Sequence, residues 1–268
     1  MKDSVFGEER KTKIMERLER EERVDVVELS QSLEVSESTV RRDLRELEEA
    51  GLLKRTHGGA VSNKIAVKNG VNLEPSFREK EVQYQREKQA IARKAVEWIR
   101  EGDTVLLDSG TTTFYILQEL KAFRQLTVVT NAVISPQHLD HHPGIELIFL
   151  GGTFRAQTQS MVGMFTEQSL GLIRVDKCFI ATNGVDPVQG LTTPTMAEAA
   201  IKRRMISCAQ EVVLVTDSSK FGRTHFAKFG ELEQIHTCIT DAGIPENDIK
   251  SLHSRGITVV TVDTDRND

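Results

Sequence analysis

Two sets of side chains in this sequence have residue types and spacings suited to binding phosphate groups. The first set surrounds residues 35–45, where hydroxyl residues precede three arginines, and a short basic segment follows at residues 54–57. Guanidinium forks suit phosphate oxygens or a guanine edge, and hydroxyl groups near a helix N-terminus can donate to phosphate. The candidate DNA-contacting residues are Ser36, Ser38, Thr39, Arg41, Arg42, Arg45, Lys54, Arg55 and His57.

The second set follows five apolar runs in the later part of the chain. After the first run, the loop at residues 108–113 reads D-S-G-T-T-T and opens a helix. Its backbone amides and hydroxyls could hold an anion such as a sugar phosphate. Small polar residues follow the other runs at 130–131, 151–155, 182–184 and 216–222. A short pattern of this kind is an ordinary turn about half the time. The inference of an anion site therefore depends on all five loops together.

A helix-turn-helix arrangement is predicted to position the first set. Residues 9–21 have apolar residues at helical spacing, residues 24–27 predict a brief strand, and a second helix is expected to run to about Leu33. Ser36 is expected to cap a third helix, which we predict to be the DNA-recognition helix and to end at Ala50 and Gly51. This order of elements is that of helix-turn-helix proteins.

Two short strands around Gly58 and Gly59 are predicted to form a hairpin wing beside that helix. Lys54, Arg55 and His57 would then face the DNA backbone. Taken alone, an R-R-x-x-R pattern on an amphipathic helix is a solvated face about two times in three. The ordered set of helix, turn, helix and basic wing favours DNA binding.

The second set is predicted to lie on an α/β sheet, mostly parallel, with helices on its faces, because apolar runs alternate with helical stretches. One continuous helical pattern covers residues 77–100, and further helices are expected at 112–121 and 195–208. Ligands of such sheets bind beyond the carboxyl ends of the strands, so the five polar loops should converge on one site. Glu198 and Lys202 could border this site or pair with each other. The expected strands are 104–107, 126–130, 146–150, 177–181, 212–216, 237–240 and 257–262.

Composition limits the classes of protein that remain. The 268 residues carry a formal net charge of −5, and even residues 1–60 hold twelve Lys and Arg against fifteen Asp and Glu. A DNA contact must therefore come from a local basic cluster, which suits a site-selective binder. No apolar run reaches membrane-spanning length and residues 1–10 are charged, so we expect a cytoplasmic protein without membrane contact. The three cysteines lack CxxC spacing and are expected to be buried free thiols.

At this point the sequence resembles a known family. V-S-x-S-T-V-R-R-D-L at 35–44, followed by L-x-R-T-H-G-G-A at 53–60, resembles the N-terminal signature of the DeoR family of bacterial transcriptional regulators. The later loops D-S-G-T-T-T, T-N, G-G-x-x-R and T-D-S-S-K-F-G resemble the DeoR sensor domain. The resemblance implies a winged helix-turn-helix with its DNA-contacting motif at about residues 24–43. It also implies a second domain that shares the fold of sugar-phosphate isomerases and CoA transferases and binds phosphorylated sugars as effectors. Carried over by position, the effector-binding residues are Asp108, Ser109, Gly110, Thr111, Thr112, Asn131, Gly152, Arg155, Asp217 and Lys220.

We therefore predict a winged helix-turn-helix domain at residues 1–61, a linker at 62–76 and an α/β effector-sensing domain at 77–268. The expected function is that of a repressor of a sugar catabolic operon, a homo-oligomer (dimer or tetramer) that binds double-stranded operator DNA and responds to a phosphorylated sugar. The alternative is an isomerase-like enzyme fused to a DNA-binding module, with a carboxylate and Lys220 transferring protons. A DNA-binding module favours recognition over turnover, so no catalytic residue or cofactor is expected. A metal site at His138, His141 and His142 is improbable, because one local cluster lacks a distant partner.

Overall fold

The computed structural model describes residues 2–21, 23–50, 52–56, 58–62, 75–133 and 144–264. The chain divides into two compact units, Met1–Glu79 and Lys80–Asp268. His57, Gly51, the histidines at 138, 141 and 142, and nearly all of the predicted linker lie outside the described residues.

The first unit is a winged helix-turn-helix. Its elements are α1 (Lys2–Glu21), β1 (Arg23–Asp25), α2 (Val26–Ser32), α3 (Glu37–Glu49), β2 (Lys54–Arg55) and β3 (Gly59–Val61). β2 and β3 form the predicted antiparallel hairpin, and β1 pairs with the other edge of β3. The turn between α2 and α3 is closed by Glu34 in the left-handed region, at φ 55°. This order of elements confirms the predicted motif.

The core of this unit comes from every element except the two-residue strand β2. Among the described residues, its buried apolar side chains are Ile14, Leu18, Val24, Val26, Leu29, Val40, Leu44, Leu47, Leu53 and Ala60. Val40, Leu44 and Leu47 stand at i, i+4 and i+7 of α3, so a single stripe of that helix faces the core and the rest is left to solvent. The predicted brief strand and second helix are both present, with the change from strand to helix at Asp25, which caps α2.

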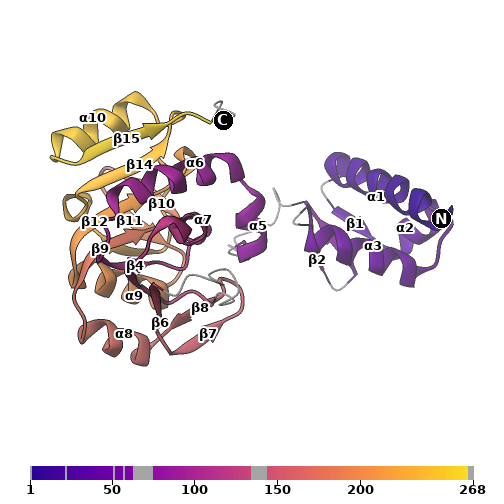
Figure 1. Ribbon diagram of the computed structural model, residues 1–268. Helices are drawn as coiled ribbons and strands as arrows, with labels where there is room; N and C mark the ends of the chain where they lie inside the picture. The colour runs from indigo at the N-terminus through magenta and orange to yellow at the C-terminus, as the bar shows by residue number, and fades with distance from the viewer. Residues whose placement is uncertain are drawn as a thin grey trace. The chain divides into compact units, whose positions relative to one another are not determined.

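The second unit is built on a seven-stranded, wholly parallel sheet (Figure 1) with the order β15-β14-β12-β9-β4-β5-β6. All seven predicted strands are present in it, with bounds that shift by at most three residues. Because the strands are parallel, their carboxyl ends lie at one edge, as the sequence predicted. The strands are β4 (Thr104–Leu107), β5 (Leu126–Thr130), β6 (Ile145–Phe149), β9 (Val175–Ile180), β12 (Ala209–Val215), β14 (Thr237–Asp241) and β15 (Thr258–Val262).

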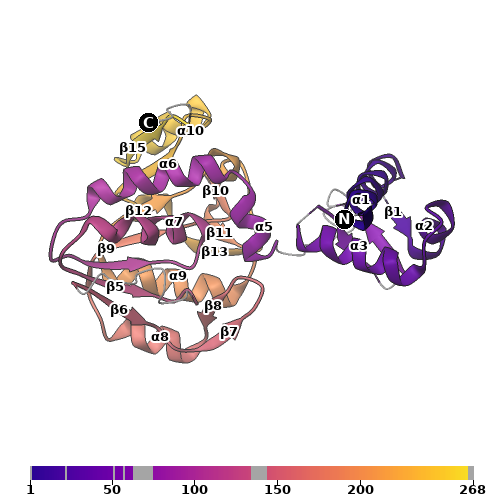
Figure 2. The ribbon, with the colours of Figure 1, turned by 45° about the vertical axis from the view of Figure 1, so that its right-hand side comes forward.

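Smaller elements surround this sheet, and the helices lie on both of its faces (Figures 1 and 2). The helical elements are α5 (Phe77–Val82), α6 (Gln85–Ala95), η1 (Val96–Trp98), α7 (Thr111–Glu119), η2 (Leu120–Ala122), α8 (Met164–Gly171), α9 (Met196–Cys208), η4 (Ser218–Lys220), η5 (Leu232–Gln234) and α10 (Glu246–Ser254). A hairpin of β7 (Thr153–Arg155) with β8 (Ser160–Val162), and a small antiparallel sheet of β10 (Gly184–Asp186), β11 (Gly190–Thr193) and β13 (Ala227–Gly230), complete the unit. Neither of these antiparallel sheets was predicted.

The helical pattern predicted over residues 77–100 is present as α5, α6 and η1, with a break that the pattern did not predict. The backbone breaks between α5 and α6, where Tyr84 adopts a left-handed conformation at φ 53°. A non-glycine residue in this region is strained, and it persists only where the surroundings hold it. Hydrophobic periodicity could not reveal the break because the apolar stripe of Ile91, Ala95 and Ile99 lies wholly after it, and α5 has no buried residue. The three cysteines are buried and free, as predicted.

Candidate DNA-binding surface and effector site

The recognition helix α3 begins where the sequence predicted. Ser36 is its N-cap, with Oγ accepting a hydrogen bond from the amide of Thr39 at 3.2 Å. The same oxygen lies 2.8 Å from the hydroxyl of Ser38 and 2.9 Å from that of Thr39. The three predicted hydroxyls therefore form one cluster at a helix N-terminus, where the macrodipole and free amides favour an anion.

The arginines of α3 are exposed and only loosely held. Arg41 lies 3.2 Å from Glu37, Arg42 lies 3.9 Å from Glu46, and the two arginine side chains are 53% and 67% exposed. Arg45 is exposed and makes no ion pair with any described residue. Exposed pairs of this kind contribute about 0–1 kcal/mol, so phosphate can compete for these guanidinium groups at small cost.

Glu48 holds the base of the wing to α3. Its carboxylate accepts a hydrogen bond from the amide of Arg55 at 3.0 Å and lies 3.7 Å from the Arg55 guanidinium and 3.9 Å from the Lys54 ammonium. The predicted wing cations are therefore fixed beside the helix.

Asp43, which directly follows Arg42 in the sequence, is instead structural. It is 1% exposed and accepts two hydrogen bonds from the guanidinium of Arg10, one of them at 2.9 Å from Nη2. These hydrogen bonds raise the pKa of Arg10 above its ordinary value. The pair joins α1 to α3 across 33 residues, which the sequence reasoning did not foresee because no local pattern pairs the two positions.

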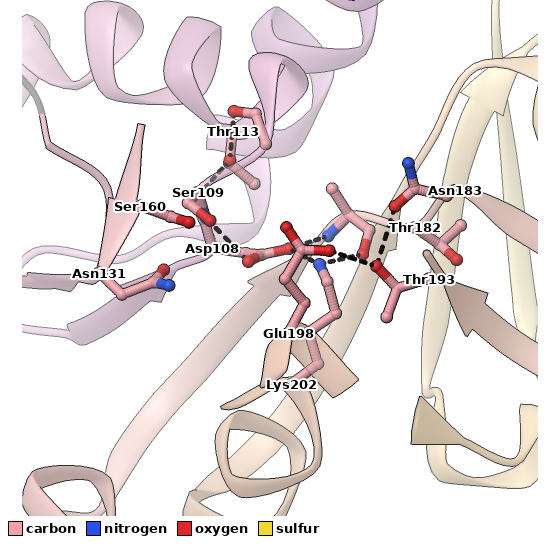
Figure 3. A network of polar contacts seen from close by, with 12 residues as sticks. Asp108, Ser109, Thr113, Asn131, Ser160, Thr182, Asn183, Thr193, Glu198 and Lys202 are labelled. Carbon is pink, nitrogen blue, oxygen red and sulfur yellow. Dashed lines mark hydrogen bonds and ion pairs between the residues drawn. The ribbon is translucent and has the colours of Figure 1, made fainter. Parts of the chain in front are cut away.

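In the second unit, the loops that follow β4, β5 and β9 lie side by side at one edge of the sheet (Figure 3). Asp108 follows β4, Asn131 follows the neighbouring β5, and residues 181–183 follow β9 on the other side. Asp217 follows β12, one strand further along. The structure therefore brings together side chains that are up to 109 residues apart in sequence.

Asp108 is the centre of a buried ion pair. It is 2% exposed, and its carboxylate accepts hydrogen bonds from the amides of Ser109 at 2.8 Å and Ala181 at 3.1 Å and from the ammonium of Lys202. Lys202 also donates to the carbonyl of Ala181 at 2.9 Å and lies over the ring of Phe229. Lys202 thus pairs with Asp108 and not with Glu198.

Glu198 belongs to a second chain of contacts. It accepts a hydrogen bond from the Thr193 hydroxyl at 3.0 Å, and its other oxygen lies 3.5 Å from Nη1 of Arg155. Arg155 also donates to the hydroxyl of Thr195 at 2.7 Å, and Thr193 donates to Asn183 at 3.1 Å. Arg155 is thus held by α9. Thr193 was not predicted as a site residue, whereas Glu198 was expected either to border the site or to pair with Lys202.

The glycines of the site have steric roles. A Cβ on Gly110 would lie 2.6 Å from Cβ of Ala181, so only glycine lets the start of α7 approach the end of β9. A Cβ on Gly152 would lie 2.1 Å from the hydroxyl of Thr166 on α8. Thr111 and Thr112 are 7% and 4% exposed in the first turn of α7.

Asn131 has an unsatisfied atom. Its side-chain amide donates to the carbonyl of Met161 at 2.9 Å, but its Oδ1 is buried and has no hydrogen-bond partner among the described residues. Ser160, on the same hairpin as Met161, lies close by in Figure 3. Buried acceptors without partners are rare and costly, and a ligand hydroxyl is one group that would satisfy Oδ1.

Asp217 and Lys220 lie on the loop that contains η4. Asp217 is 1% exposed and caps η4, its Oδ1 accepting from the amide of Ser219 at 3.2 Å. The ammonium of Lys220 lies 3.7 Å from Oδ2 of Asp217 and 3.2 Å from the hydroxyl of Ser219. Burial lowers the pKa of Lys220 below its ordinary value, and the charge of Asp217 opposes that shift. Asp108 and Lys220 thus have separate ion-pair partners.

Comparison with known protein families identifies both units. The model of the DeoR C-terminal sensor domain matches residues 83–242, and that of the DeoR-like helix-turn-helix domain matches residues 10–66. This chain belongs to the DeoR family. It is a DNA-binding transcriptional regulator and not an enzyme, so the isomerase alternative is set aside.

Curated DeoR relatives match over most of their length. The transcriptional regulator GlpR of Haloferax volcanii is 39% identical, over 94% of this chain and 96% of the relative. A putative aga operon transcriptional repressor of Escherichia coli O157:H7 is 36% identical, over 95% and 93%. The lactose phosphotransferase system repressor of Staphylococcus epidermidis is 37% identical, over 80% and 84%.

Among solved structures, ribose 5-phosphate isomerase A from Methanocaldococcus jannaschii is similar with a TM-score of 0.37 and 17% identity, over 52% of this chain and 55% of that one. A likeness of this size carries no functional argument. None of the described helices is both long and apolar enough to span a membrane. Within the described ranges, no three His, Cys, Asp or Glu side chains are grouped so that they could hold a metal ion.

Proposed function

We propose that this DeoR-family protein represses an operon for the catabolism of a sugar, and that a phosphorylated form of that sugar releases it from operator DNA. The proposal rests on one observation: a chain with a winged helix-turn-helix also brings Asp108, Asn131 and the Asp217–Lys220 loop to one edge of a parallel sheet. The names of the aga operon and lactose relatives are consistent with it.

We assign the phosphate and the sugar hydroxyls of the effector to different polar groups of the site. Phosphate oxygens would accept from Lys220 and from the first turn of α7, while sugar hydroxyls would meet Asn131 and the carboxylates. We propose as its ligands the ten predicted residues, although Gly110 and Gly152 contribute through close backbone approach. To bind the effector, Arg155 would have to break its ion pair with Glu198 or contact Glu198 and the effector at the same time.

Operator DNA is assigned to the exposed cations of α3 and the wing, namely Arg41, Arg42, Arg45, Lys54 and Arg55, with the hydroxyl cluster of Ser36, Ser38 and Thr39 and with His57. Helix-turn-helix proteins read repeated half-sites, so we propose a homo-oligomer in the cytoplasm. Residues 1–61 would bind DNA, residues 62–76 would connect, and residues 77–268 would sense.

A thermal-shift screen of the full chain against phosphorylated and free sugars tests the effector. A ligand that binds only the folded protein raises the unfolding midpoint by mass action. We expect one phosphorylated sugar to raise the midpoint and the matching free sugar to leave it unchanged. That phosphosugar should also release the protein from a duplex selected out of a random DNA pool, and Lys220→Ala should remove the release while leaving DNA affinity intact. Release by the free sugar alone would contradict the proposal.

A further inference from the structure

One buried ammonium in the second unit has no carboxylate partner. Lys88, on α6, is 3% exposed, and its Nζ donates to the carbonyl of Gln83 at 2.5 Å and to the carbonyl of Lys80. No carboxylate of a described residue lies within 4 Å of this nitrogen. A buried charge held only by two neutral carbonyls is costly, and an ammonium has a third N–H to offer.

The groups around Lys88 come from α5 and from the Asp217–Lys220 loop. Burial lowers the pKa of Lys88 to about 8; the charge of Asp217 opposes this shift, and the charges of Lys220 and Lys80 add to it. The junction of α5 and α6 also touches this loop directly, because Nζ of Lys220 lies 5.8 Å from the ring centroid of Tyr84. Lys88 therefore lies beside the loop to which the effector phosphate is assigned.

Around Lys88 and Lys220, positively charged side chains outnumber negatively charged ones. Besides Lys88 and Lys220, the charge of Arg223 acts on Lys220, and Lys80 acts on both lysines. The pKa of His225 is also lowered, first by burial and then by the charges of these neighbours. Facing them are the carboxylates of Asp217 and Glu81. An incoming dianion would relieve repulsion among the cations that share this space.

We infer that Lys88 binds the anionic group of the effector together with Lys220, and that anion binding there changes the conformation of α5. The connection is made by the hydrogen bonds that Lys88 donates to the carbonyls of Lys80 and Gln83. The inference rests on the proposed function above. α5 spans the boundary between the two units, which falls between Glu79 and Lys80. When an anion accepts a hydrogen bond from the Lys88 ammonium, the hydrogen bonds from Lys88 to the carbonyls of Lys80 and Gln83 weaken. The end of α5 is then free to change conformation. Lys88 thus couples the effector site to the connection between the two units.

The first test uses inorganic phosphate as the probe on the full chain at pH 7, with chloride at matched ionic strength. Phosphate should raise the unfolding midpoint of the wild type, and Lys88→Gln should weaken phosphate binding roughly tenfold or more, as loss of a charge-assisted hydrogen bond implies. Lys94→Gln on the same helix, whose native lysine pairs with exposed Glu97, is the matched control and should respond as wild type does. An unchanged phosphate response in Lys88→Gln would overturn the inference.

Hydrogen exchange of the peptide covering residues 77–84 tests the coupling. In the wild type, phosphate should change the exchange of this peptide. In Lys220→Ala, which keeps Lys88 but lacks the other phosphate ligand, that change should be lost. If Lys88 only stabilised the fold, phosphate would leave exchange at α5 unchanged in the wild type, and the coupling would be wrong.

A conservative variant keeps the inference testable if Lys88→Gln does not fold. With sulfate, whose charge is constant over this range, the stabilisation of the wild type should fall as pH rises from 7 to 9, since Lys88 loses its proton near pH 8. Lys88→Arg keeps its charge, so its response should fall less. Any contribution of Lys220 is common to the two proteins and does not affect the difference between them. Identical pH profiles would contradict the role of Lys88.

The outcomes separate this inference from the proposed function. If a phosphosugar releases DNA and Lys220→Ala prevents release, but Lys88→Gln behaves as wild type, the proposed function stands and the inference fails. If inorganic phosphate and sulfate bind through Lys88 but no phosphosugar releases DNA, the anion site stands and the proposed function fails.

Discussion

The two functional regions of this protein hold their positive charges in opposite ways. On α3 the guanidinium groups are exposed, and those of Arg41 and Arg42 lie 3.2 Å and 3.9 Å from carboxylates of the same helix. In the sensor unit, Lys88 and Lys202 are 3% and 8% exposed and are fixed by carbonyls or by a buried carboxylate. The DNA surface can therefore change partners at little cost, whereas each sensor cation is part of the fold.

The largest effect is expected where a buried pair is broken. Lys202→Met keeps the bulk of the side chain but removes the cation from Asp108, leaving a buried carboxylate with two backbone amides as donors. Removing one member of such a pair typically costs about 3–5 kcal/mol of unfolding free energy. Denaturant unfolding checks the loss, and Arg42→Met on the exposed face is the control, expected within about 0.5 kcal/mol of wild type. Equal losses in the two variants would contradict the contrast between the regions.

The second prediction concerns pH. Burial lowers the pKa of Lys88 from 10.5 to about 8, so between these values the unfolded chain holds a proton that the folded protein has released. Lys88 therefore contributes an unfavourable term that is fully present below pH 8 and is relieved as pH rises towards 10.5, by at most about 3 kcal/mol. The unfolding free energy of Lys88→Met relative to wild type should accordingly decrease as pH rises from 7 to 10. A difference that stays constant over this range would show that Lys88 is not buried as a cation.

The third prediction concerns the exposed set. Arg42→Ala should weaken binding to a selected operator about tenfold to a hundredfold, as loss of one guanidinium contact to a base or phosphate implies, with the sensor unit unchanged. Fluorescence anisotropy at physiological salt measures the affinity, and Arg20→Ala, exposed at the end of α1, is the matched control. If the Arg42→Ala variant bound the operator with unchanged affinity, the assignment of α3 as the recognition helix would be wrong.

The same contrast explains what could be predicted from the sequence. The cap at Ser36, the apolar stripe of α3 and the hairpin after it are local patterns, and the structure has all three. The parallel strands could also be predicted, because each contains a short run in which apolar and β-branched residues predominate. The partners of the buried charges were not, since Arg10–Asp43 and Lys202–Asp108 join residues 33 and 94 positions apart. Such pairs follow from tertiary packing, which no spacing in the sequence encodes.

The smallest expected effect is at the wing. Arg55 lies beside Glu48 at the base of the hairpin, where a cation would meet the sugar-phosphate backbone and not a base edge. Arg55→Ala should therefore weaken binding to selected and unrelated duplexes by the same factor, and should lower the slope of log affinity against log salt by about one. Arg42→Ala, in contrast, should lower the ratio of specific to nonspecific affinity if its guanidinium reads a base. A loss of sequence preference in Arg55→Ala would indicate that the wing contacts base edges in a groove. The assignment of base contacts to α3 and of backbone contacts to the wing would then be wrong.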